Sequence, residues 1–263
     1  MNKIKLITSV ALATLGALSA HAGITVSAFD LILGFTQSGG SNLEVNLGSA
    51  ANLVTLSGGA EVSLVGATTG LKLADLQTFG AGTAWQNGST AWGVIGASNA
   101  GTDGNLIWGT VKGGATVGTP GAAQGTTNNA IKSMYGTANG ALGGSGAAVS
   151  ANSTNSAFVA SSLANSWRTR ATSSLNFSYS PWSSKLTQTT AGLATNTFQS
   201  AALYAFTEGA ASADFVGTFK LYNDGGFTFT AIPEPSTYAA ILGVATLGFA
   251  AIRRRKQQIQ AQA

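Results

Sequence analysis

Carboxylates are the side chains of this 263-residue chain that could act in pairs as general acid and base. Residues 23–230 hold eight of them, namely Asp30, Glu44, Glu61, Asp75, Asp103, Glu208, Asp214 and Asp224. A glycosidase needs two carboxylates that flank one bond, so a carboxylate-dependent glycan hydrolase or lyase stays open as an alternative. Residues 104–207 contain no carboxylate at all. We therefore predict no catalytic residue and a protein that is not an enzyme.

The sequence lacks the residue types that most other reactions require. It has no cysteine, and its single histidine, His21, lies among the first 22 residues. Histidine-assisted nucleophiles, Cys/His zinc sites and iron–sulfur clusters are therefore excluded from residues 23–230. The turns at Asp103 and Asp224 offer two or three oxygens, whereas calcium takes about six to eight. We expect no metal and no cofactor.

The first 22 residues predict a secretory signal peptide. Lys3 and Lys5 accompany an apolar stretch that ends at Leu18, and the small residues Ala20 and Ala22 close it. We expect export by the Sec machinery and cleavage after Ala22. Cleavage there removes His21.

The last 33 residues, 231–263, have a different layout. Pro233, Glu234 and Pro235 precede an apolar segment at 236–252, which is followed by the basic cluster Arg253, Arg254, Arg255 and Lys256. The 17 residues of 236–252 make about 25 Å of helix, slightly less than the roughly 30 Å of a hydrocarbon core. We predict a transmembrane helix whose basic cluster stays cytoplasmic and leaves the preceding residues outside.

This order of a Pro-Glu-Pro motif, an apolar helix and a basic cluster resembles the PEP-CTERM sorting signal of Gram-negative bacteria. The resemblance implies transient anchoring in the inner membrane and cleavage near Pro233–Pro235 by exosortase. It further implies delivery to the cell surface or to an extracellular matrix of exopolysaccharide. The segments 30–35 and 45–48 are similar to the start of uncharacterised PEP-CTERM proteins.

The charge of the exported body argues against nucleic acid as a partner. Residues 23–230 carry seven basic and eight acidic side chains, a net charge of −1, whereas the whole chain carries +4. Binding of a polyanion such as DNA needs clustered cations that neutralise phosphates. The basic character belongs to the two ends of the chain, so we exclude nucleic acid.

Residues 23–230 predict one mainly β body. Alternating apolar residues and Gly-rich turns predict strands at 24–35, 43–47, 61–64, 92–95, 106–111, 175–179 and 202–206, and a hairpin at 215–222 and 227–230. Candidate segments for short helices are 71–79, a turn within 126–134 and 156–167. Residues 113–157, rich in Gly, Ala, Ser, Thr and Asn, read as a loop insertion. The predicted fold is an antiparallel β-sandwich or a jelly-roll-like body with one or two short helices.

The tryptophans suggest how such a body could contact a glycan. Trp85 and Trp182 lie in polar segments and could stack on sugar rings, whereas Trp92 and Trp108 lie in apolar strands and are expected in the core. We therefore predict a non-enzymatic protein of the polysaccharide matrix. Proteins named ice-binding also carry this type of tail, but the threonines here lack the regular spacing of an ice-binding array.

Overall fold

The computed structural model describes most of the exported body. The described residues are 29–37, 40–57, 59–65, 70–82, 84–86, 89–98, 105–120, 124–135, 147–150, 155–164, 166–172, 188–191 and 193–232, with residues 243, 246, 247, 252 and 253 of the tail. Several features predicted from the sequence lie outside the described residues. They are the signal peptide with Ala20 and Ala22, the strand at 175–179, Trp182, Pro233–Pro235 and Arg254–Lys256.

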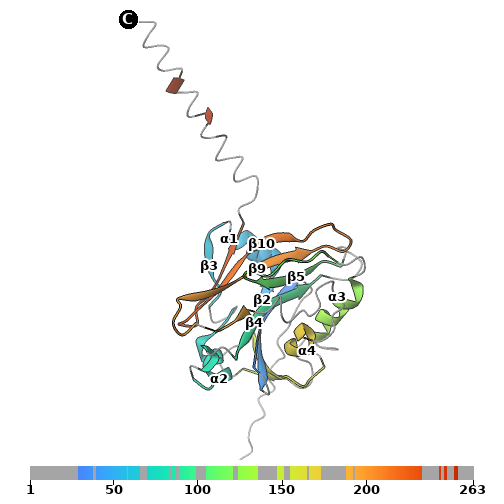
Figure 1. The fold of residues 1–263 in the computed structure, drawn as a ribbon, viewed down its shortest axis with the longest axis vertical. Helices are drawn as coiled ribbons and strands as arrows, with labels where there is room; N and C mark the ends of the chain where they lie inside the picture. The colour runs from blue at the N-terminus through green and yellow to red at the C-terminus, as the bar shows by residue number, and fades with distance from the viewer. Residues whose placement is uncertain are drawn as a thin grey trace, which may run out of the picture.

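Within these residues, eleven strands form one antiparallel sheet (Figure 1). The strands are β1 Asp30–Thr36, β2 Ser41–Ser49, β3 Glu61–Ser63, β4 Ala91–Ala97, β5 Ile107–Lys112, β6 Ala147–Val149, β7 Ser156–Ala160, β8 Gln188–Thr189, β9 Phe198–Phe206, β10 Asp214–Tyr222 and β11 Phe227–Ala231. Their order is β3-β11-β10-β9-β5-β4-β1-β2-β7-β6, and β8 pairs with β4. The mainly β, antiparallel character predicted from the sequence is confirmed.

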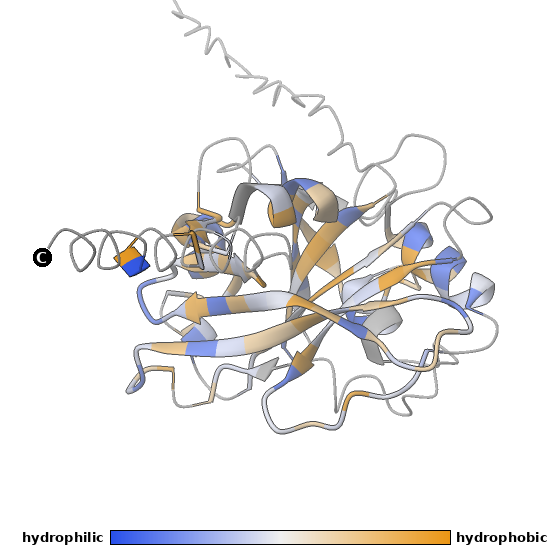
Figure 2. Ribbon diagram, turned by 90° about the horizontal axis from the view of Figure 1, so that it is seen from above, coloured by the Kyte–Doolittle hydropathy of each residue, from blue (hydrophilic) through white to orange (hydrophobic). Residues whose placement is uncertain are grey.

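The sheet curls so that one of its faces encloses the main core. Alternate residues of β1, β2, β4, β9, β10 and β11 point to this concave face, where α1 Ala50–Ser57 and α2 Leu73–Phe79 add further apolar side chains. Trp92 of β4 and Phe227 of β11 lie four places apart in the sheet order, yet their ring centroids are 5.8 Å apart. Figure 2 shows hydrophobic residues concentrated along the central strands. Aromatic contacts across the concave core therefore join strands that are far apart in the sheet order.

The C-terminal hairpin follows the predicted pattern. Phe219 and Leu221 of β10 and Phe227 and Phe229 of β11 are all fully buried on the concave face. The turn between the strands is fixed by Gly225, whose φ of 86° favours glycine, and by the Asp224 carboxylate, which accepts a hydrogen bond from the Gly226 N–H. The period-2 pattern thus identified both strands, their turn and their buried face.

The convex face is covered only over part of the sheet. The helix α3 Gly125–Lys132, the 3₁₀ turn η2 Ser133–Tyr135 and the helix α4 Trp167–Thr172 pack on apolar residues of β1, β4, β5 and β7. Figure 1 shows α3 and α4 together, away from α2. Because β1 is covered on both faces, all seven of its residues are buried.

A buried carboxylate fastens α4 to the sheet. The Trp167 indole lies over Gly34, where a Cβ atom would come within 2.2 Å of the ring, and Gly34 is opposite Glu44 in the register of β1 and β2. The Glu44 carboxylate accepts a 2.6 Å hydrogen bond from the Trp167 backbone N–H. Burial raises the pKa of Glu44 to about 8, although this hydrogen bond acts in the opposite direction.

Three sequence expectations need correction. The described strands form one continuous curled sheet in place of the two sheets of a sandwich or jelly roll. The helix predicted at 156–167 is wrong, because Ser156–Ala160 is the strand β7 and the helix α4 begins at Trp167. Within 113–157, the predicted loop insertion contains α3, η2 and β6.

Another expectation fits. The predicted helix at 71–79 is α2. As a separate observation, Asp30 lies beside a β-bulge, where its carboxylate accepts a hydrogen bond from the Asn46 side-chain amide. The predicted transmembrane segment lies largely outside the described residues. In the described part of the chain, no helix has both the length and the apolar character needed to cross a membrane.

The contact between Trp92 and Phe227 predicts a large effect of truncation. Trp92→Ala should lower the free energy of unfolding by about 3–5 kcal/mol, because it leaves a cavity where the sheet closes. Phe198→Ala, at a side chain that is 43% exposed, is the matched control and should change it by about 0.5 kcal/mol. Urea unfolding measures both values. Equal losses in the two variants would contradict closure by Trp92.

The raised pKa of Glu44 predicts a pH-dependent stability. The folded state binds this proton more tightly than the unfolded state, so stability is fully present below about pH 4.5 and falls as the pH rises to about 8, by roughly 3–5 kcal/mol. Glu44→Gln keeps the acceptor for Trp167 and should remove this fall. Asp214→Asn, at an exposed position, should keep it. Urea unfolding at several pH values between about 4.5 and 8 measures the free energy of unfolding of each variant. If this free energy changes with pH in the same way for the parent and Glu44→Gln, the role of Glu44 is rejected.

Candidate functional site

The structure places the predicted tryptophans differently from one another. Trp92 and Trp108 are buried in the concave core, as expected. Trp85 is only 1% exposed and belongs to the same core, so its ring offers no face to a sugar. Its neighbours in sequence are polar, but the 3₁₀ turn Ala84–Gln86 directs its indole inward. The prediction of Trp85 as a stacking residue is therefore wrong, and Trp182 lies outside the described residues.

The carboxylates are dispersed and engaged with different partners. Asp75 is buried and accepts a hydrogen bond from the Ser150 hydroxyl, and Glu208 accepts hydrogen bonds from the Asn105 side chain and the Gln124 backbone N–H. Asp214 is exposed, and Asp103 is not among the described residues. In the described part of the chain, no group of three acidic, His or Cys residues could hold a metal ion.

A different set of residues gathers on the outer face of the sheet. Side chains that alternate with core residues of β9, β10, β11 and β3 point away from the core. We call this set the outer strip. Its members are Phe198, Ser200, Ala202 and Tyr204 of β9, Phe215, Thr218, Lys220 and Tyr222 of β10, Thr228 and Thr230 of β11, and Glu61 and Ser63 of β3.

Aromatic rings mark both ends of the outer strip along β9 and β10. At one end Phe198 lies opposite Tyr222, with ring centroids 5.7 Å apart. At the other end Tyr204 lies opposite Phe215, with centroids 5.5 Å apart. Phe198 and Phe215 are 43% and 39% exposed, and they are the two phenylalanines among the exposed large apolar side chains of the described residues. Phe198 and Phe215 therefore each have a neighbouring ring for support and still remain exposed.

Glu61 is the polar centre of the outer strip. Its carboxylate accepts hydrogen bonds from the Thr228 hydroxyl at 2.6 Å, the Tyr222 hydroxyl at 2.6 Å and the Lys220 ammonium at 2.9 Å. Lys220 also lies 5.2 Å from the centroid of the Phe198 ring. One carboxylate therefore fixes the side chains of two neighbouring strands, β10 and β11.

The same contacts set the charge of the strip. Hydrogen bonds from Thr228, Tyr222 and Lys220 lower the pKa of Glu61 to about 2. The hydrogen bond to Glu61 raises the pKa of Lys220 and that of Tyr222. Glu61 and Lys220 are the only charged members of the strip and form an ion pair, so the strip is neutral across the physiological pH range.

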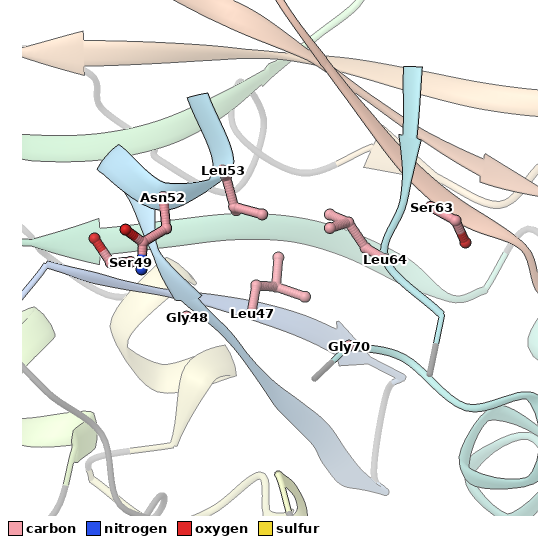
Figure 3. A pocket seen from close by; sticks show the side chains of 8 residues that line it. All are labelled: Leu47, Gly48, Ser49, Asn52, Leu53, Ser63, Leu64 and Gly70. Carbon is pink, nitrogen blue, oxygen red and sulfur yellow. The ribbon is translucent and has the colours of Figure 1, made fainter. Parts of the chain in front are cut away.

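A small pocket lies at the other face, between β2, α1 and β3 (Figure 3). It has a volume of about 200 Å³. Leu47, Leu53 and Leu64 point toward one another at its centre, whereas Ser49 and Asn52 lie at one side. None of the residues that line it is ionisable, so the pocket offers packing space but no acid–base group.

The outer strip is not predicted by the sequence. The alternation in β9, β10 and β11 identified which residues are buried, and the remaining residues of the same strands form the strip. What the sequence could not supply was the pairing of β3 with β11, which brings Glu61 beside residues more than 150 positions away. Thr218 and Thr230 also pair on this face, but Lys220 and Tyr222 interrupt any regular threonine array.

The described fold runs directly into the predicted sorting tail. Ala231 is the last residue of β11 and pairs with Gly217, and the Ile232 N–H donates to the Val216 carbonyl at 3.1 Å. The next residue, Pro233, has no N–H with which to extend this ladder. The chain therefore changes from paired strand to motif within two residues.

Comparison with known proteins identifies the tail. No curated protein and no solved structure matches the chain, and the resemblance expected for residues 30–35 and 45–48 found no support. Residues 231–256 match the family model of the PEP-CTERM protein-sorting motif. This motif implies export, anchored transit through the membrane to the surface, and exosortase as the processing partner. The chain thus carries a PEP-CTERM protein-sorting motif, in agreement with the tail's sequence pattern.

Proposed function

We propose that this protein is a non-enzymatic component of the cell surface or extracellular matrix that holds exopolysaccharide on the outer strip. The observation that carries the proposal is the pair of exposed aromatic rings, Phe198 and Phe215, on a face rich in hydroxyl groups. Flat aromatic faces pack well against the apolar faces of sugar rings, and hydroxyl side chains exchange hydrogen bonds with sugar hydroxyls. The sorting motif supports a destination where such polymers occur.

The hydrogen bonds of the strip support the same function. Thr228, Tyr222 and Lys220 converge on one carboxylate, so their positions are set before a ligand arrives. A preorganised surface loses less conformational entropy on binding than a mobile one. Because Thr218, Thr230, Ser200 and Ser63 surround this cluster, a polysaccharide would meet several hydroxyl groups at once.

Truncation of one exposed ring tests the proposed function. The protein recovered from the producing cells should co-sediment with the producer's own exopolysaccharide, and Phe198→Ala should lower its affinity about 2- to 10-fold, through loss of one aromatic contact. Val65→Ala, which truncates a side chain that is 43% exposed outside the strip, is the matched control and should bind like the parent. Absence of binding by the parent would reject the function.

The same preparation separates a binding protein from a hydrolase or lyase. After incubation with the exopolysaccharide, the length distribution of the polymer should be unchanged, because the proposal assigns no residue to bond cleavage. Chain shortening by the parent that disappears in one amide variant, such as Asp30→Asn, Glu61→Gln or Glu208→Gln, would establish an enzyme instead.

The tail predicts a defined processed form. We expect the extracellular protein to begin at Gly23 and to lack the basic cluster Arg253–Lys256. Intact-mass measurement of the extracellular material checks both ends. A mass that includes residues 253–263 would indicate a permanent membrane anchor. Replacing Pro233, Glu234 and Pro235 by alanine should leave export intact and stop the cleavage.

A further inference from the structure

Resting on the proposed function, we infer that the outer strip binds a single extended, uncharged polysaccharide chain that lies along β9 and β10 and stacks on both aromatic ends. Phe198 and Tyr204 are separated by six residues of one strand, a distance of about 20 Å at roughly 3.3 Å per residue. The register places Tyr222 opposite Phe198 and Phe215 opposite Tyr204. Both strands therefore carry an aromatic ring at each end of the same track.

The residues between the two aromatic ends are smaller. Ser200 lies opposite Lys220, and Ala202 lies opposite Thr218. Lys220 reaches toward Glu61, and its ammonium also lies 5.2 Å from the centroid of the Phe198 ring. The track therefore carries aromatic side chains at both ends and mostly small side chains between them, an arrangement suited to an extended chain that lies lengthwise. A single sugar residue could occupy one end only.

The direction in which the polysaccharide lies follows from the positions of the aromatic and the hydroxyl side chains. All four aromatic residues are on β9 and β10, whereas the neighbouring members on β11 and β3 are hydroxyl side chains and Glu61. A polymer that crossed the strands would leave the aromatic track after one contact. A polymer that follows β9 and β10 stacks at both ends and presents one edge to Thr228 and Thr230 of β11.

The charge of the strip selects an uncharged polymer. An acidic polysaccharide needs an unpaired cation, but Lys220 is 2.9 Å from the Glu61 carboxylate and also lies over the Phe198 ring. Both members of this pair stay charged across the physiological pH range, since the pKa of Glu61 is lowered and that of Lys220 is raised. Binding should therefore depend weakly on salt and on pH between about 4 and 9.

The test uses fragments of the producer's exopolysaccharide, made by partial hydrolysis and sorted by length and charge. For the parent, the affinity for uncharged fragments should rise about 2- to 10-fold once a fragment spans about 20 Å, because the second aromatic end is then engaged. Phe198→Ala and Phe215→Ala should each remove this gain and leave the affinity for short fragments at one end. Val65→Ala should keep the gain. Calorimetry or affinity electrophoresis measures these values.

The outcomes separate this inference from the proposed function. If the parent fails to bind the intact polymer, the function itself is wrong. If the parent binds the intact polymer but its affinity does not depend on fragment length, or if Phe215→Ala binds long fragments like the parent, only the lengthwise track is wrong. Preference for acidic fragments with a steep salt dependence would overturn the assignment of an uncharged ligand. Sedimentation that shows a dimer converted to a monomer by Phe198→Ala would make the strip an interface between copies.

Discussion

The curl of the sheet is the constraint on which the rest of the structure depends. Trp92 and Phe227 come from strands that are four places apart in the sheet order, and their rings meet across the concave core. A flat sheet with these residues would expose a large apolar face to water, at a cost of about 25 cal/mol for each Å². Curling buries that face with few helices. It also explains why a chain without disulfides can stabilise a β-rich body of this size.

The curl also determines which parts of the convex face stay open. The helices α3 and α4 cover the convex side of the strands at the middle of the sheet, and the Glu44 carboxylate holds the start of α4 there. The strands β9, β10, β11 and β3 continue past this cover. Apart from Phe206 of β9, which is buried under this cover, the outward side chains that form the outer strip are half-exposed or exposed, and several of their polar groups bind one another through Glu61. The outer strip is thus a consequence of unequal covering of one sheet.

Local patterns in the sequence predicted the elements better than their arrangement. The alternation of Phe219, Leu221, Phe227 and Phe229 around an Asn-Asp-Gly-Gly turn specifies a hairpin without help from the rest of the chain. The strand at Ser156–Ala160 was predicted as a helix because its residues have weak preferences, and pairing with β2 decides the outcome. The prediction of Trp85 as a stacking residue is wrong because the polar residues next to it in sequence do not determine the direction in which its indole points. The continuous sheet and the Glu61 cluster depend on pairing between distant segments, which a single sequence does not reveal.

The junction between the body and the tail separates the outer strip from the sorting motif in the sequence. The strip includes Phe215, and the next residue, Val216, accepts the last backbone hydrogen bond of the body from Ile232. One aromatic end of the strip therefore lies beside the point where the tail leaves, and the other end lies about 20 Å farther along the strands. Every residue of the strip precedes Ala231, the first residue of the sorting motif. Cleavage anywhere after Ile232 consequently leaves each strand of the strip and the Glu61 cluster intact, so a surface formed during transit persists in the processed protein.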